Sequence, residues 1–145
     1  MGREQLEQLR LHGSYVSVPK GVSMRPLIRG DRDAVEIRAE DRPARPGDLV
    51  LYTRENGQGV IHRVIKVRPD GCRVLCGDNC WQPEYVRPEQ IAGFAVRICR
   101  DGKWQELCRG RWAVYARVWT RLFFLRRPLF YLRDRLRGHI KKRKN

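Results

Sequence analysis

A serine on a bend and a histidine on a strand are the residues of this chain whose types and setting could do chemistry on a peptide bond. Ser23 lies between Gly21 and a Met-Arg-Pro turn, where a hydroxyl is reachable because the backbone leaves regular structure. A serine hydroxyl is a poor nucleophile near neutral pH and needs a positioned base. His62 is the candidate base, because imidazole titrates near neutrality and His12 and His139 lie in the terminal segments.

An imidazole base needs a third group that orients its second nitrogen and stabilises the charged ring. Two carboxylates, Asp78 and Glu84, follow on a segment rich in turn residues that begins at Gly77. Each piece also has an ordinary explanation, since serine beside glycine is common in turns, a strand histidine is most often structural, and Gly-Asp-Asn is a common turn. The order and setting of the pieces favour a Ser23–His62 pair with Asp78 or Glu84 as third member.

Short strands with tight turns are the elements that must position these residues. Alternating or β-branched apolar runs predict the strands, and Gly-containing turns separate them. A short helix over residues 3–11 precedes them, with Gly13 able to end it. We therefore expect a mostly β fold, a small coiled antiparallel β domain over residues 1–108. The expected strands cover residues 15–18, 34–38, 49–53, 60–67, 72–75, 91–99 and 103–107.

The positive charge of the chain is concentrated in a C-terminal tail, residues 109–145. Residues 1–108 hold 18 Lys/Arg against 15 Asp/Glu, whereas the tail holds 13 Lys/Arg and only Asp134. Apolar and aromatic residues recur in the tail at three- and four-residue spacing, which predicts one or two basic amphipathic helices. Pro128 is expected to break or kink this helical segment, and a second helix would then carry Leu129, Leu132, Leu136 and Ile140 on one stripe.

A basic amphipathic tail suits an anionic membrane surface. The alternative is that its apolar side packs on the β body while the charges are solvated. Nucleic acid is the less favoured partner, because the β body has no basic face and no recognition motif. The longest apolar run, residues 112–125, is interrupted by Arg117 and Arg121, so no clear transmembrane helix is expected. We expect a cytoplasmic protein, peripheral at the inner face of the membrane.

The five cysteines favour a reducing compartment, because an odd number does not close into a disulfide framework and no secretory signal peptide opens the chain. The spacing of Cys72, Cys76 and Cys80 differs from the usual zinc-binding pairs. Small buried hydrophobic side chains are the favoured interpretation of these three. We expect neither a metal nor a cofactor.

Residues 15–98 resemble the type I signal peptidase family, within the wider group that includes the LexA-type self-cleaving repressors. The first motif of that family is Ser-Met followed by Pro and then Gly-Asp. One branch uses His as the base, in a His-Arg-Val setting, and has a Gly-Asp-Asn motif further on. The matching residues here are Ser23-Met24, Pro26, Gly30-Asp31, Pro46-Gly47-Asp48-Leu49-Val50, Ile61-His62-Arg63-Val64-Ile65 and Gly77-Asp78-Asn79.

The resemblance implies a serine endopeptidase that cleaves a peptide or precursor protein through an acyl-enzyme, after small residues, with Ser23 as nucleophile and His62 as base. It leaves the third member open. Glu84 holds the position of the acid that the His branch has six residues after its motif Asp, whereas Asp78 lies in the intact motif and is slightly preferred.

Two features depart from the family. Many relatives have a hydroxyl residue two positions before the nucleophile, which helps to form the oxyanion hole, and Gly21 stands there in this chain. The N-terminal transmembrane anchor of signal peptidases is also missing from these residues. The second hypothesis is therefore a non-catalytic peptide-binding relative, recruited to a membrane or a partner by its basic tail.

Overall fold

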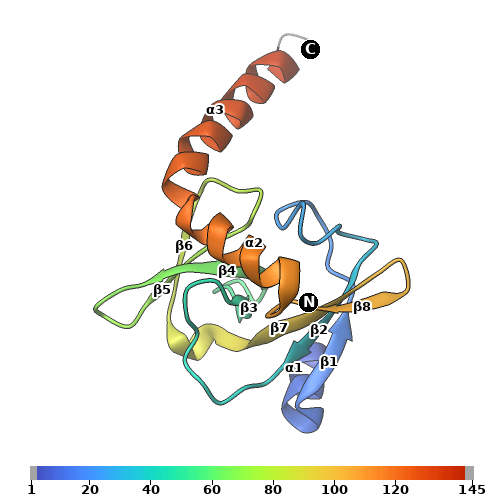
Figure 1. Ribbon diagram of the computed structural model, residues 1–145. Helices are drawn as coiled ribbons and strands as arrows, with labels where there is room; N and C mark the ends of the chain where they lie inside the picture. The colour runs from blue at the N-terminus through green and yellow to red at the C-terminus, as the bar shows by residue number, and fades with distance from the viewer. Residues whose placement is uncertain (1–2, 143–145) are drawn as a thin grey trace.

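The fold is an eight-stranded antiparallel sheet with a short helix before it and two helices after it (Figure 1). This computed structural model describes residues 3–142 and the side chains of residues 7–137. The strands follow the order β1-β2-β7-β3-β4-β5-β6, and β8 pairs with β7. Their bounds are β1 Ser14–Ser17, β2 Ala34–Arg38, β3 Leu49–Thr53, β4 Gly59–Val67, β5 Arg73–Cys76, β6 Glu84–Val86, β7 Ile91–Arg100 and β8 Lys103–Glu106.

The predicted β fold is confirmed, and all seven expected strands occur within one or two residues of their expected bounds. Turn residues explain why the sequence predicts these strands. For example, Asp101 and Gly102 both have positive φ, as a two-residue hairpin turn between right-twisted strands requires. The strand β6 was not predicted. It has only three residues, and it pairs with β5 so that Glu84 lies opposite Leu75. Glu84 thus belongs to the sheet rather than to a loop.

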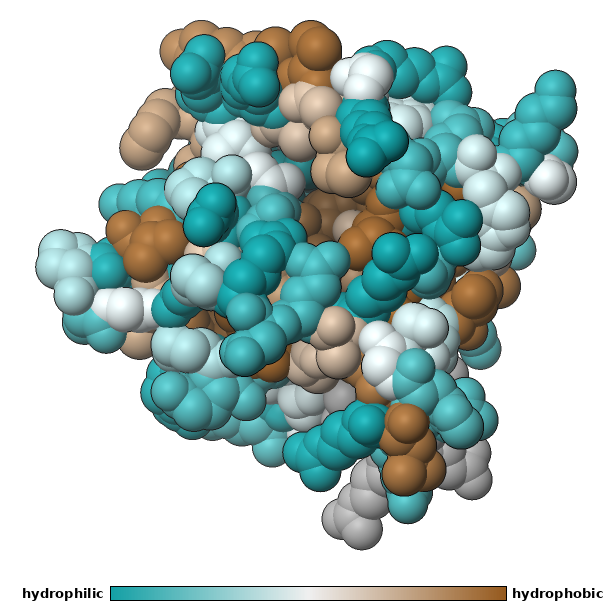
Figure 2. All heavy atoms as spheres, turned by 60° about the horizontal axis from the view of Figure 1, so that its bottom comes forward, coloured by the Kyte–Doolittle hydropathy of each residue, from teal (hydrophilic) through white to brown (hydrophobic). Residues whose placement is uncertain are grey.

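The core lies on both faces of the sheet, as β3 illustrates. Successive side chains of a strand point to opposite faces. Leu49 and Leu51 join one buried cluster, whereas Val50 and Tyr52 join another. Register shifts in the pairings of β2 with β7, β3 with β7 and β4 with β5 allow the strands to bend around these clusters. Figure 2 shows the face at the bottom of Figure 1, where hydrophilic residues dominate and hydrophobic ones line a central hollow.

The N-terminal helix α1 (Arg3–His12) ends at Gly13, as its sequence indicates. Gly13 has φ of 70°, and its N–H donates to the carbonyl of Leu9 at 3.0 Å, which closes the last turn. Leu9 is buried in the same cluster as Leu51. The helix therefore covers one edge of the core.

Two helices follow the sheet, α2 (Gly110–Arg121) and α3 (Phe123–Lys142), and the break between them lies at Leu122. The prediction of a break at Pro128 is wrong, because α3 continues through this residue. The carbonyl of Leu122 accepts the N–H groups of Leu125 and Arg126, which starts the new helix. The change of direction buries Phe123 against the sheet. Within residues 3–142 no helix is long and apolar enough to span a membrane.

The five cysteines are all free thiols. Cys76 is buried, as expected, and burial raises the pKa of its thiol to about 12. Cys72 and Cys80 are only partly buried, so the expectation of burial holds for one of the three.

Candidate functional site

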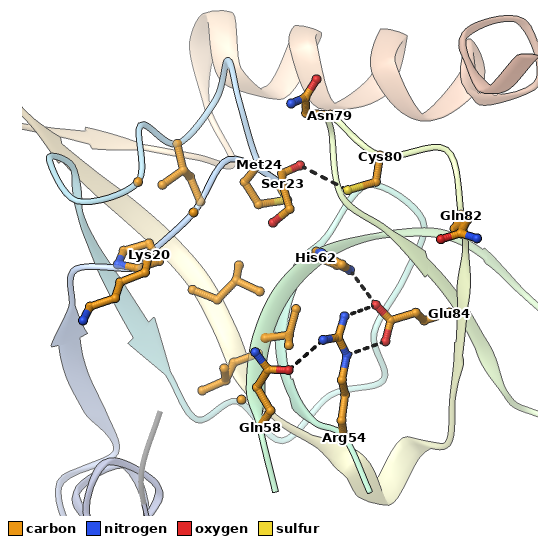
Figure 3. Close-up of a pocket in the computed structure, with 18 of the residues that line it drawn as sticks. Lys20, Ser23, Met24, Arg54, Gln58, His62, Asn79, Cys80, Gln82 and Glu84 are labelled. Atoms are coloured by element: carbon orange, nitrogen blue, oxygen red, sulfur yellow. Dashed lines mark hydrogen bonds and ion pairs between the residues drawn. The ribbon is translucent and has the colours of Figure 1, made fainter. Parts of the chain in front are cut away.

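A cleft of about 1220 Å³ contains the serine and histidine that the sequence singled out. Figure 3 shows that the Ser23 side chain points into this cleft, on the opposite side of His62 from Glu84. The cleft wall comes from the β1–β2 connection, β3 and the β3–β4 connection, β4, the segment from the β5–β6 connection into β6, and α3. Its polar lining includes Ser23, Arg54, His62, Asn79, Glu84, Arg127 and Asp134.

The bend that carries Ser23 is held by its neighbours on both sides. Gly21 has φ of 90°, and a Cβ at Gly30 would lie 1.9 Å from the Gly21 carbonyl oxygen, so both positions require glycine. Met24 and Leu27 are buried in the core. Ser23 itself is half-buried, and within the described residues its N–H donates to no backbone carbonyl. The turn therefore directs the Ser23 side chain into the cleft and leaves its backbone N–H without a carbonyl partner among the described residues.

His62 lies in β4 and is almost fully buried, with 4% of its surface exposed. Its Nδ1 lies 3.2 Å from the Tyr52 hydroxyl and 3.5 Å from Glu84 Oε1. Burial lowers the pKa of His62 to about 4, and the nearby Arg54 lowers it as well, while the Glu84 charge opposes both effects. The ring is therefore neutral near pH 7, with one nitrogen free to accept a proton.

Glu84 is the carboxylate that faces His62, and Arg54 holds it. Arg54 donates to the two carboxylate oxygens at 2.8 and 2.5 Å. These hydrogen bonds, with a further one from Tyr52, keep the pKa of Glu84 below its usual range. A carboxylate only accepts hydrogen bonds, so in one arrangement Tyr52 donates to Glu84 while its oxygen accepts from Nδ1–H of His62. In this tautomer Nε2 is the acceptor, and it is the tautomer that a general base at Nε2 requires.

The other ring nitrogen of His62 faces the serine side of the cleft. A Cβ placed on Gly77 would lie 3.1 Å from His62 Nε2 and 2.6 Å from the carbonyl oxygen of Ser23. The N–H of Asn79 donates to that same carbonyl at 2.8 Å. The Gly-Asp-Asn segment therefore holds the serine turn next to His62. Its glycine is needed because a side chain at Gly77 would push the serine turn and His62 apart.

Asp78 makes a different set of contacts. It is fully buried and binds Arg63 through two hydrogen bonds of 2.8 Å each. The Tyr115 hydroxyl donates to its Oδ2 at 3.1 Å. The structure therefore brings Glu84 to Nδ1 of His62, and it places the slightly preferred Asp78 in a buried ion pair with the residue that follows His62.

The two C-terminal helices hold the Gly77–Cys80 segment from outside. Trp119 Nε1 and Arg126 Nη1 each donate to the carbonyl of Asp78 at 3.0 Å. Arg133 donates to the side chain and the carbonyl of Asn79 at 2.6 and 3.0 Å. The tail is thus packed on the β body through α2 and the first half of α3. His139 and Ile140 lie outside the part of α3 whose side chains are described.

Sequence reasoning missed two residues of the site, Tyr52 and Arg54. They lie two positions apart in and just after β3, so they share a side of that strand, and β3 pairs with the strand of His62. This period-two pattern beside a candidate histidine is the signal that could have found them. Missing from the described residues is any group of three His, Cys, Asp or Glu side chains that could hold a metal ion.

The Ser23 hydroxyl makes no hydrogen bond to His62 within the described part of the chain. Contacts between a nucleophile and its base are often long without substrate and shorten when it binds. Comparison of the chain with protein-family models, curated proteins and solved structures found no match. The function is therefore argued from the site.

Proposed function

We propose that this protein is a serine endopeptidase with Ser23 as nucleophile, His62 as general base and Glu84 as the group that orients His62. The observation that carries the proposal is the orientation of the His62 ring. Its Nδ1 faces Glu84 and Tyr52, while its Nε2 faces the serine side of the same cleft. The resemblance of Ser23-Met24 and Ile61-His62-Arg63 to signal peptidases of the His branch supports the same roles.

In the proposed reaction, Nε2 of His62 takes the proton of Ser23 as Oγ attacks the carbonyl carbon of the scissile peptide bond. Glu84 stabilises the imidazolium that forms. The tetrahedral intermediate collapses when His62 gives its proton to the leaving amine nitrogen, and an acyl-enzyme remains on Ser23. Water then attacks the ester, His62 accepts a proton from it and returns that proton to Ser23 Oγ.

The backbone N–H of Ser23 is the donor that we assign to the developing oxyanion. It is uncommitted to a backbone carbonyl of the described residues, and Gly21 supplies no side-chain donor. Loss of one oxyanion donor typically costs about 10²–10³ in rate, so a hole without a side-chain hydroxyl implies a slow enzyme.

The second candidate function is peptide binding without catalysis. The missing hydrogen bond between Ser23 and His62 favours it, as does Arg54, which neutralises part of the Glu84 charge. In that case the cleft would hold an extended peptide, and Ser23 would act only as a turn residue.

A fluorophosphonate probe distinguishes the two candidates, because it reacts with an activated serine and leaves an adduct at that residue. We expect one adduct per chain, located at Ser23 by peptide mass spectrometry. Ser14 and Ser17, which precede the same turn, serve as internal controls and should stay unmodified. A chain that remains unlabelled, or that is labelled equally at Ser17, would exclude the endopeptidase.

The pH dependence of acylation is a further prediction. His62 acts as base only when neutral, and burial lowers its pKa to about 4. The rate constant for probe labelling should therefore fall as the pH drops through about 4, and stay level above about pH 6. Labelling rates measured across this range, with circular dichroism to check the fold, test it. A midpoint near 6.5, the ordinary histidine value, would contradict this prediction.

A further inference from the structure

A continuous apolar stripe runs along the outer side of α2 and α3. Its members recur at intervals of four, three, four, three and four residues, and each is 40–66% exposed. Phe124, 73% exposed, and Tyr131, 42% exposed, widen it on one side. Figure 1 shows α3 extending away from the β body, so no other described element covers its outer part. The members of the apolar stripe are Val118, Leu122, Leu125, Leu129, Leu132 and Leu136.

The apolar stripe is not the side of the helices that packs on the protein. Successive residues of a helix are turned by about 100°. Phe123 and Arg126 are buried against the sheet and the Gly77–Cys80 segment, and Arg133 binds Asn79. These contacts occupy one side of α3 and leave the leucines unpartnered. A surface of this length and composition marks an interaction site.

The positive charge around the apolar stripe favours an anionic partner. Six arginines of α2 and α3 are exposed, and Asp134 is the only acidic residue in the whole tail. A second copy of the chain would bring two such surfaces together, with like charges beside the apolar contact. An anionic bilayer instead offers hydrocarbon for the leucines and headgroups for the arginines. The exposed arginines are Arg111, Arg117, Arg121, Arg127, Arg135 and Arg137, of which Arg127 faces the cleft and is not counted as a headgroup contact.

We propose that the apolar stripe docks the protein on an anionic lipid bilayer, with α3 lying in the interface. Arg127 is two residues from both Leu125 and Leu129, and two residues along a helix are turned by about 200°. Arg127 also lines the cleft. The cleft side of α3 is therefore opposite the apolar stripe, so docking leaves the cleft accessible. The proposal does not depend on the peptidase activity.

Vesicle flotation of the full chain tests the docking. We compare vesicles of phosphatidylcholine alone with vesicles that contain about a third phosphatidylglycerol, at about 0.1 M and about 0.5 M salt. The protein should float with the anionic vesicles at low salt, and binding should weaken as salt screens the arginines. The triple variant Leu125→Gln, Leu129→Gln, Leu132→Gln should bind at least about tenfold more weakly, because it loses three apolar anchors.

A matched variant changes three exposed apolar residues of the β body and α1: Leu11→Gln, Val16→Gln, Val67→Gln. It should bind within about twofold of the parent. Substitution is preferable to removal of the tail, since α2 and α3 also hold the cleft wall. Failure of the parent to float, equal binding to neutral vesicles, or unchanged binding of the Leu125, Leu129 and Leu132 variant would each overturn the proposal.

A stripe-dependent dimer would overturn it too, and sedimentation velocity of the parent and the leucine variant detects one. Fluorophosphonate labelling provides a separate readout of the cleft. Protein that floats but is not labelled would exclude the peptidase activity and support membrane docking. Protein that is labelled but never floats would support the peptidase activity and exclude membrane docking.

Discussion

Replacement of Glu84 by Gln is expected to slow the acylation of Ser23 by about 10⁴-fold, the loss seen when the acid of a Ser-His-Asp triad is replaced by its amide. The glutamine side chain would keep the volume but could present its amide N–H to Nδ1, which favours the opposite tautomer of His62. It would also leave Arg54 without its carboxylate beside a ring that must become positive. The labelling rate with a fluorophosphonate, measured near pH 7, gives the effect directly.

The matched control for this experiment is Glu55→Gln, an exposed acid on the β3–β4 hairpin that faces solvent. It should label at the parent rate, and Ser23→Ala should give the unreactive baseline. If Glu84→Gln labels within about threefold of the parent, Glu84 does not orient the base and the assignment fails.

Replacement of Asp78 by Ala is expected to lower the free energy of unfolding by about 3–5 kcal/mol, because it leaves a buried cation without its partner. Arg63 is 1% exposed, and Asp78 accepts two short hydrogen bonds from it. The Tyr115 hydroxyl would lose its acceptor as well. Equilibrium denaturation in urea measures the change, and a loss below about 1 kcal/mol would show that the pair is not a structural anchor.

Two variants calibrate that result. Asp70→Ala removes a carboxylate from an ion pair with Arg68 in which both side chains are about half exposed, and it should cost under about 1 kcal/mol. The double variant Asp78→Ala, Arg63→Met should recover part of the stability lost in the single variant, because no unpaired charge then stays buried.

The choice between the two acids illustrates what the sequence could and could not predict. Asp78 and Glu84 were both found as candidates from their place after His62. The intact Gly-Asp-Asn motif favoured Asp78, whereas the contact of Glu84 with Nδ1 of His62 in the structure favours Glu84. Neighbouring strand residues point to opposite faces, so an acid that binds Arg63 is turned away from the side where His62 needs one. That rule requires knowing which partner each acid takes, and local sequence does not carry this information.

In the tail, too, local sequence predicts some features and not others. Helical spacing predicted its helices and the Leu129, Leu132 and Leu136 part of the apolar stripe, because periodicity is a local signal. The presence of proline favoured a break or kink at Pro128, whereas α3 continues through Pro128 and the helices break at Leu122, beside Phe123, which packs on the sheet. The contacts of Trp119, Arg126 and Arg133 with the Gly77–Cys80 segment join residues 41, 48 and 54 positions apart. No local pattern predicts such contacts.

The contacts that α2 and α3 make with Asp78 and Asn79 also set an order of events during synthesis. A ribosome releases the serine turn, the histidine strand and the Gly-Asp-Asn segment before Trp119, Arg126 and Arg133 exist. Domains generally fold as units during synthesis, the N-terminal ones first. The nascent β body therefore carries every residue assigned to the reaction while one wall of the cleft is still unsupported. The cleft wall is complete only after α2 and α3 have been synthesised and have docked on this segment.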